Sequence, residues 1–487
     1  MRIKDIFKPI DLSKGNITKN IILFSIPILL TLLLQQVYTI TDAAIAGQNL
    51  SANEIAGIND VGCLTVIVLQ FGFGCSSGFS ALTAKAFGAN KLEDVKKSFA
   101  IQIVITFLIG VFLTIVGLLS INIMLSWINI TKENPVYEYA YLYIFIYFCG
   151  TLAQLFFNLF SSVLRSIGDS VTPLLFLLLS CIINVILDIL FIVSFKWGVA
   201  GAAIATIIAQ ILSGILCFIY SYKKYDVFKI KISDLNIDWK YALDHLKNGV
   251  PLGLQFSVLA VGIILMQGAV VKFDVASNDP TQPAQLGYGT ASKLFNALMT
   301  FQSGLGSAML SYCGQNEGAK EYERVRKGTI QALIIAIVGS VILGALGLLL
   351  NINGFFLYLF LSPSNINSQT IKYSNYYFYV NMPLFIFLGT LYVGRNSLQG
   401  IEKPLFPFLA GVAELITRVV VSLYFPSMVN PTDPTSDISY IALMFGDGFA
   451  WINATIVLMI GLFRNVYLNP KYNLKRAEKK KGLTIHL

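Results

Sequence analysis

Twelve long apolar runs constrain this chain more than any other feature of its sequence. They cover roughly residues 20–46, 55–82, 98–121, 138–163, 173–194, 197–222, 248–271, 285–311, 329–351, 374–397, 405–427 and 438–463. A helix needs about 20 apolar residues to cross a hydrocarbon core of about 30 Å, and each run exceeds that length. Because an isolated strand cannot satisfy its backbone groups in lipid, the runs predict helices. We therefore expect an all-α polytopic membrane protein with twelve transmembrane helices.

The Lys and Arg residues follow an alternating pattern between these runs. If the N-terminus lies inside, the inside segments hold 29 of the 35 basic residues and the outside segments hold 4. Such a bias places the basic segments of a membrane protein in the cytoplasm. We therefore expect a multi-pass protein of the cell (plasma) membrane with both termini in the cytoplasm. Residues 1–19 are polar and the first run is long, so we expect no cleavable signal peptide.

A duplicated segment indicates two related halves. Residues 71–97 resemble residues 301–327 at a fixed offset of 230, with eight of 27 positions identical. We predict an N-terminal six-helix lobe (1–225), a basic cytoplasmic linker (226–247) and a C-terminal six-helix lobe (248–487). Because six is even, both halves enter the membrane in the same direction. Parallel repeats of this kind are typical of solute carriers with a cavity between two lobes.

Few ionisable side chains interrupt the apolar runs. They are Asp42, Asp60, Asp188, Lys293, Glu414, Arg418 and Asp447. Each is a functional candidate, because a charge at mid-helix costs about 2.5–3.5 kcal/mol on insertion scales. Asp60 and Asp447 lie near the outer ends of their runs, where we expect contact with water. Lys293 either lines a cavity or extends its amine to the interface.

The first half carries two of these acids at a similar depth. Asp42 lies about 6 Å and Asp188 about 10 Å from the outer ends of their helices, and Asn184 precedes Asp188 by one helical turn. Thr206 of the next run lies roughly 13 Å from the same surface. Further polar side chains of this half are Gln35, Tyr38 and Asn158. Two carboxylates in one low-dielectric pocket cannot both stay charged and unpaired, so one binds a proton or a cation joins them. The alternative is that Asp42 faces outside water and Asp188 bonds only to Asn184.

The second half differs at the corresponding positions. At the offset of 230, Asn184 becomes Glu414 and Asp188 becomes Arg418, a spacing that predicts an ion pair within one helix. This pair has either a structural role or a substrate-facing one. In the first run, Pro27 removes a helix hydrogen bond and could act as a hinge linked to Asp42, or as a static kink.

At these residues the chain resembles the multidrug and toxic compound extrusion (MATE) family, within the superfamily that includes lipid-linked oligosaccharide flippases. The matching stretches are IPILLTLLLQQVYTITDAAIAG, AKAFGANKLEDVKK, LRSIGDSVTP, NVILDILFI with WGVAGAAIAT, and GAKEYERVRKG. The resemblance implies twelve helices in two bundles and export of organic cations in exchange for Na⁺ or H⁺. The DinF-like branch carries its cation site in the N-terminal lobe. Carried over to this chain, that site comprises Asp42, Asn184, Asp188 and Thr206, which would also be the metal ligands if the ion is Na⁺.

We therefore predict a cation-coupled secondary antiporter that exports amphipathic, cationic organic solutes or drugs. The substrate cavity is predicted to include Gln35, Tyr38, Asn158, Lys293 and Arg418. We expect H⁺ or Na⁺ as the coupling ion and no other cofactor, a small organic solute and membrane lipid as partners, no nucleic acid, and a monomer.

Two other functions fit the sequence less well than this prediction. A flippase for a lipid-linked sugar would need several cationic side chains to hold a pyrophosphate, and only Lys293 and Arg418 are clearly intramembrane bases. An enzyme is not expected, because the sequence contains no GxSxG, HExxH, P-loop or GxGD pattern.

Overall fold

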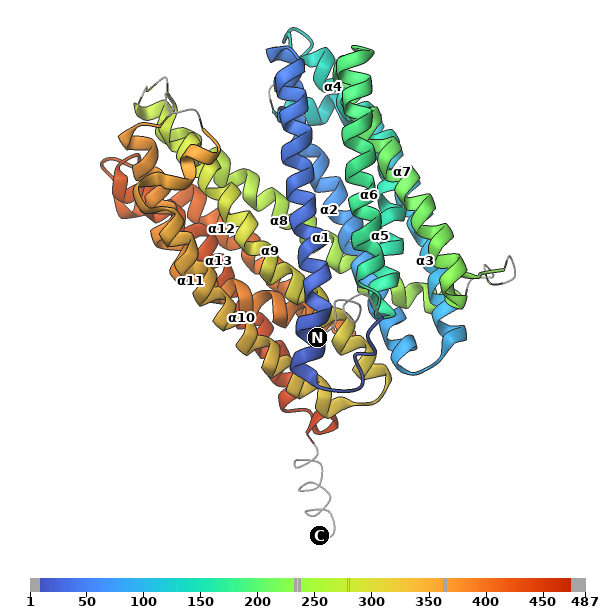
Figure 1. Cartoon of the computed structure of the whole chain (residues 1–487). Coiled ribbons are helices and arrows are strands. Elements are labelled where there is room, and N and C mark those ends of the chain that lie inside the picture. The colour runs from blue at the N-terminus through green and yellow to red at the C-terminus, as the bar shows by residue number, and fades with distance from the viewer. Residues whose placement is uncertain are drawn as a thin grey trace. The chain divides into compact units, whose positions relative to one another are not determined.

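The computed structural model describes residues 9–473, except 129, 232–233, 235–237, 278, 280 and 362–365. Every regular element in this part of the chain is a helix (Figure 1). Contacts divide the chain into two units. Unit 1 comprises Met1–Ser257, Ser311–Glu321 and Gly400–Pro404. Unit 2 comprises Val258–Leu310, Tyr322–Gln399 and Leu405–Leu487.

Unit 1 contains the first seven α-helices and the beginning of the eighth. They are α1 (Ile17–Asn49), α2 (Ala52–Gly88), α3 (Leu92–Trp127), α4 (Tyr137–Cys149), α5 (Thr151–Ser166), α6 (Val171–Asp188), α7 (Gly198–Lys224) and α8 (Trp239–Ser277). A π-helix, η2 (Ile189–Ser194), continues α6, and a short 3₁₀ turn, η3 (Asp226–Phe228), follows α7. Helix α2 packs against α3, α4 and α5, while α6 packs against both α1 and α7.

Unit 2 contains the rest of α8 and the helices that follow. They are α9 (Pro283–Gly318), α10 (Tyr322–Leu350), η5 (Ile352–Leu359), α11 (Ser368–Gly400), α12 (Leu405–Val429), α13 (Asp437–Leu462), η7 (Phe463–Tyr467) and η8 (Pro470–Tyr472). Helix α12 packs along α13. Aromatic side chains fill the core: the ring of Phe295 on α9 stacks on Trp451 of α13 at 5.4 Å and meets Phe385 of α11 edge-on.

The helices agree with the predicted apolar runs. In the part of the chain described, ten helices are long and apolar enough to cross a membrane, or eleven if the bent pair α4 and α5 forms one span. Helix α9 has 36 residues but is outside that set, and it is rich in Gly, Ser and Gln. With α9 included, each of the twelve predicted runs corresponds to a helix or to the bent pair.

The run 138–163 differs from the single straight helix that we expected. Helices α4 and α5 meet at Gly150 with a bend of 46°. A Cβ atom on Gly150 would lie 2.3 Å from the Cγ1 atom of Ile207 on α7, which is closer than real contacts allow. The bend therefore occurs where a glycine lets α7 approach the backbone.

The duplicated segments form turns with the same backbone conformation. Asn90 and Lys320, 230 positions apart, have φ angles of 56° and 61°. In unit 1 the two turns also contact each other. A Cβ atom on Gly88 would lie 1.9 Å from the Gln315 carbonyl oxygen, and one on Gly318 would lie 1.8 Å from the Lys85 carbonyl oxygen. The two repeated glycines thus allow each turn to pack on the backbone of the other.

The contact units do not follow the lobes predicted from the repeat. The predicted linker, residues 226–247, contributes η3 and the first turns of α8 to unit 1. The segment Ser311–Glu321, which is the end of α9 and the turn after it, also belongs to unit 1, although it lies in the second half of the sequence. The lobe boundaries themselves stay a prediction.

A buried carboxylate outside the apolar runs fixes the start of α6. Asp169 is 2% exposed and accepts hydrogen bonds from the backbone N–H groups of Val171 and Thr172, at 3.1 and 2.9 Å. Burial alone would raise the pKa of Asp169. The hydrogen bonds from Thr172 and from the hydroxyl of Tyr225, with the charge of Lys224, outweigh burial and hold the pKa below its ordinary value. Asp169 thereby anchors the helix that carries Asn184 and Asp188.

Candidate cation-binding site

Three neighbouring helices of unit 1 bring the predicted acidic residues together. Asp42 lies on α1, Asp188 is the last residue of α6, and Thr206 lies on α7. The π-helix η2 begins directly after Asp188 and contacts α1, α6 and α7. A π-helical turn widens the backbone and is frequent at functional sites. Asp188 thus lies where three helices and a widened turn meet.

A single hydroxyl group links the uncharged members of the site. The hydroxyl of Tyr38 donates to the Oγ1 atom of Thr206 at 3.3 Å, and the amide nitrogen of Asn184 donates to the same atom at 3.5 Å. The Thr206 hydroxyl in turn donates to the carbonyl oxygen of Ala202 at 3.1 Å. This arrangement uses the hydroxyl donors of Tyr38 and Thr206 and one N–H group of Asn184. The Oδ1 atom of Asn184 is buried and accepts no hydrogen bond within the described chain.

The two carboxyl groups lie within hydrogen-bonding reach of each other. Asp188 is 0% exposed, and neither of its carboxylate oxygens receives a hydrogen bond from a donor in the described residues. The same holds for the Oδ1 atom of Asp42. Two ionised carboxylates can only accept hydrogen bonds, so a bond between them exists only when one carries a proton. Without that proton, the pair needs a cation to offset its charge.

The site offers oxygen atoms for a small hard cation. The ligand set combines the carboxylates of Asp42 and Asp188 with the free amide oxygen of Asn184. The hydroxyl of Thr206 could join it only by giving up one of the two hydrogen bonds that it accepts. Oxygen ligands of this kind suit hard ions. No group of three or more His, Cys, Asp or Glu side chains in the described part of the chain could share a metal ion. A ligand set of carboxylate and neutral oxygens fits a proton or a monovalent ion such as Na⁺.

No hydrogen bond or ion pair among the described residues joins the other residues predicted for this lobe to the acids. Gln35 is exposed, and its backbone carbonyl accepts the hydroxyl of Thr39. Asn158 is half-buried on α5. Pro27 is buried inside α1, which continues through it from Ile17 to Asn49. Its role as a hinge stays a prediction.

Sequence reasoning missed two tyrosines of α4. Tyr143 and Tyr147 both interact electrostatically with Asp42, and their rings stack at a centroid distance of 5.9 Å. Tyr147 also forms a hydrogen bond with Gln154 of α5. The i, i+4 spacing of the tyrosines places them on one helix face. That spacing could have paired them with each other, but nothing in the run YEYAYLYIFIYFC indicates which face meets Asp42.

In unit 2 the predicted pair of Glu414 and Arg418 belongs to a larger buried cluster. The Nη1 atom of Arg418 lies 3.4 Å from Glu414, and its Nε atom lies 2.8 Å from Asp447 on α13. Arg395 of α11 forms a further ion pair with Glu414. The cluster holds two positive and two negative side chains, and each base contacts at least one acid.

One expectation about this cluster was wrong. Asp447 is not a water-exposed residue at a helix end, because its side chain is 14% exposed and pairs with Arg418. Arg395, which the sequence analysis did not single out, is 2% exposed within α11. The predicted cavity residue Lys293 is exposed on α9, and its Nζ atom lies 5.8 Å from the ring centroid of Phe360.

Comparisons with known proteins identify the family. The MatE family model matches residues 27–190 and 286–424, which together exceed half of the chain. The probable multidrug resistance protein YoeA of Bacillus subtilis (strain 168) is 24% identical over 327 residues, covering 65% of this chain and 68% of the relative. The probable multidrug resistance protein YpnP of the same organism is 26% identical over 322 residues, covering 65% and 69%.

Solved structures show the same fold. An outward-facing multidrug resistance MATE family transporter of the MOP superfamily matches with a TM-score of 0.82 and 18% identity, over 94% of this chain and 98% of that one. A MOP superfamily transporter from Pyrococcus furiosus Vc1, described by the reverse polarity of its binding pocket, matches over the same shares with a TM-score of 0.80 and 18% identity. The chain therefore belongs to the MatE family of multi-pass membrane transporters and is not an enzyme.

Proposed function

We propose that the chain is a secondary antiporter of the DinF-like branch, in which entry of H⁺ or Na⁺ drives export of amphipathic, cationic organic solutes across the cell membrane. The observation that carries this proposal is the pair of carboxyl groups of Asp42 and Asp188 in unit 1, which lie within hydrogen-bonding reach of each other and have three buried oxygens that receive no hydrogen bond from the described residues. Two curated relatives are named as probable multidrug resistance proteins, which supports organic solutes as the cargo.

Coupling requires that the ion and the solute weaken each other's binding. A proton or Na⁺ ion at Asp42 and Asp188 neutralises the negative charge that would attract a cationic solute to unit 1. The solute therefore leaves when the ion arrives, and this antagonism is reciprocal because binding free energies are linked. One hydrogen-bonded group lies beside the acids and can respond to their charge. It consists of Tyr38, Asn184 and Thr206.

The buried acids Glu414 and Asp447 of unit 2 do not indicate a second ion-coupling site. Glu414 has Arg395 and Arg418 as partners, and Asp447 has Arg418. Because each of these acids already pairs with a fixed base, neither needs a proton or a metal ion for charge balance. The same pairing argues against the flippase alternative, since Arg418 is engaged by two acids and is not available to a pyrophosphate.

Efflux from proteoliposomes under imposed gradients tests the proposal. Export of a fluorescent cation such as ethidium should follow an inward H⁺ or Na⁺ gradient in the wild type. It should fall at least tenfold in Asp42→Asn and in Asp188→Asn. The matched control is Asp60→Asn, the same change at an exposed carboxylate of α2. The proposal fails if both site variants export as fast as the control under either gradient.

The orientation and the assembly belong to the same proposal. We infer that both termini face the cytoplasm, from the strong bias of basic residues to one side. We further infer that a monomer is the working unit, because all members of the candidate site lie on α1, α6 and α7 of one chain.

A further inference from the structure

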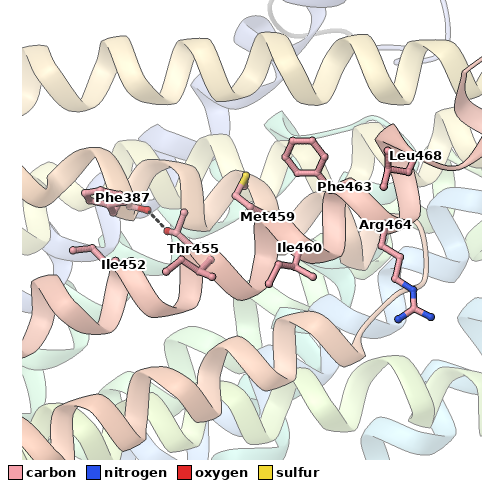
Figure 2. Close-up of a pocket in the computed structure, with 9 residues that line it drawn as sticks. Phe387, Ile452, Thr455, Met459, Ile460, Phe463, Arg464 and Leu468 are labelled. Carbon is pink, nitrogen blue, oxygen red and sulfur yellow. Dashed lines mark hydrogen bonds between the residues drawn. The ribbon is translucent and has the colours of Figure 1, made fainter.

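An apolar groove runs along the last membrane helix of unit 2. Its volume is about 460 Å³, and its lining comes from α13, the π-helix η7, Leu468 directly after it and one residue of α11 (Figure 2). Isoleucine, methionine, phenylalanine and leucine side chains form most of the walls. The one hydroxyl in the lining, that of Thr455, donates to the carbonyl oxygen of Phe387 at 3.0 Å. The groove therefore offers an apolar surface with its hydroxyl donor already used.

One end of this groove carries a positive charge. Figure 2 shows the guanidinium of Arg464 beyond Ile460, at the same end as Leu468 and opposite Ile452. Arg464 is exposed, and no carboxylate of the described residues forms a salt bridge with it. It lies in the π-helical turn Phe463–Tyr467. The groove thus ends at a cation that can accept an anionic group.

The length of the groove matches one layer of a bilayer. Ile452 and Arg464 are separated by 12 positions, and at 1.5 Å per residue this spans about 18 Å. Half of a hydrocarbon core of about 30 Å is about 15 Å. An acyl chain lying along α13 from Ile452 would therefore bring its headgroup to the level of Arg464.

The charge at the groove end favours an anionic lipid. Arg464 opens the most basic terminal segment of the chain, which the charge bias assigns to the cytoplasmic side. The cytoplasmic leaflet carries anionic lipids. A cationic solute would be repelled by the guanidinium, and a zwitterionic headgroup would gain less from it. We propose that this groove binds an anionic phospholipid of the cytoplasmic leaflet, with one acyl chain along α13 and its phosphate on Arg464.

Lipid binding by the purified full-length protein tests the headgroup contact. Native mass spectrometry would compare phosphatidylglycerol with phosphatidylcholine of identical acyl chains. We expect the wild type to prefer phosphatidylglycerol. In Arg464→Gln the ratio of phosphatidylglycerol binding to phosphatidylcholine binding should fall about fivefold, which is the effect of one basic residue near an anionic headgroup. The matched control is Lys403→Gln, which removes one exposed positive charge of another predicted cytoplasmic segment. Equal loss in both variants, or no preference in the wild type, would overturn the proposal.

A second pair of variants tests the acyl-chain contact. Ile456→Trp should fill the groove and reduce binding of both lipids, since Ile456 lines it and is 53% exposed. Ile342→Trp makes the same change on α10, outside the groove, at a residue that is 61% exposed. We expect this control to bind lipid as the wild type does. Unchanged binding in Ile456→Trp would place the lipid elsewhere and refute the site.

Discussion

Removal of the Glu414 carboxylate should destabilise unit 2 strongly. In Glu414→Gln, Arg395 and Arg418 keep their positive charges at 2% and 6% side-chain exposure, and Asp447 alone remains to balance them. Breaking a buried ion pair by removing one partner costs about 3–5 kcal/mol. That cost lowers the ratio of folded to unfolded protein by about two to four orders of magnitude. Equilibrium unfolding of the purified protein in mixed detergent micelles with increasing dodecyl sulfate would measure the change.

The ion pair of Lys85 and Glu402 provides the matched control. Its N···O distance is 2.8 Å, but its side chains are 44% and 25% exposed. Glu402→Gln should therefore cost only about 0–1 kcal/mol. Combining Glu414→Gln with Arg395→Met should recover a large part of the lost stability, because it removes the uncompensated charge. If Glu414→Gln and Glu402→Gln have equally small effects, the reasoning about the buried cluster is wrong.

Two further predictions concern packing and acid stability. Gly318→Ala should lower the yield of monodisperse protein in size-exclusion chromatography, because its new Cβ atom would meet the Lys85 carbonyl oxygen; Gly289→Ala, with open space around it, should not. The pKa of Asp169 is lower in the folded protein than in the unfolded chain, where it is about 3.9. Its carboxylate therefore stabilises the folded protein fully above the unfolded pKa, and this stabilisation is lost as the pH falls through the folded pKa. Asp169→Asn should therefore lower stability at neutral pH by about 1.5–3 kcal/mol and flatten its dependence on pH below about 4, measured by the same unfolding titration. If the stability of Asp169→Asn falls with pH below about 4 as steeply as that of the wild type, this explanation is wrong.

The sequence predicts the helices and the grouping of the polar residues of the N-terminal half well, because both depend on local spacing. The length of each apolar run predicts the length of its helix. Helices α6 and α7 are consecutive in the chain, so a short connection keeps them side by side. Asn184 and Asp188 share a face of α6 by helical spacing. Asp42 lies on α1 and Thr206 on α7, and both of these helices pack against α6. Depth in the membrane and short connections thus suffice to bring these residues together.

The remaining features depend on how distant helices rotate against one another. Arg395 and Asp447 join Glu414 and Arg418 from α11 and α13, and no spacing along the chain indicates which faces meet.

The bend at Gly150 and the π-helix after Asp188 have a similar origin. Both arise where α7 packs closely on its neighbours. A glycine within an apolar run does not by itself reveal the side chain that approaches it. Such features therefore require the packed structure.

The most direct test of the account is the protonation of the Asp42 and Asp188 pair. Infrared difference spectroscopy on purified protein would compare sodium-free buffer with buffer that contains Na⁺, and the wild type with Asp42→Asn and Asp188→Asn. We expect a protonated-carboxyl band in the sodium-free wild type that decreases when Na⁺ or an exported cation binds and is absent from both variants. A wild-type spectrum that no cation changes, or that both variants reproduce, would contradict the shared acidic site.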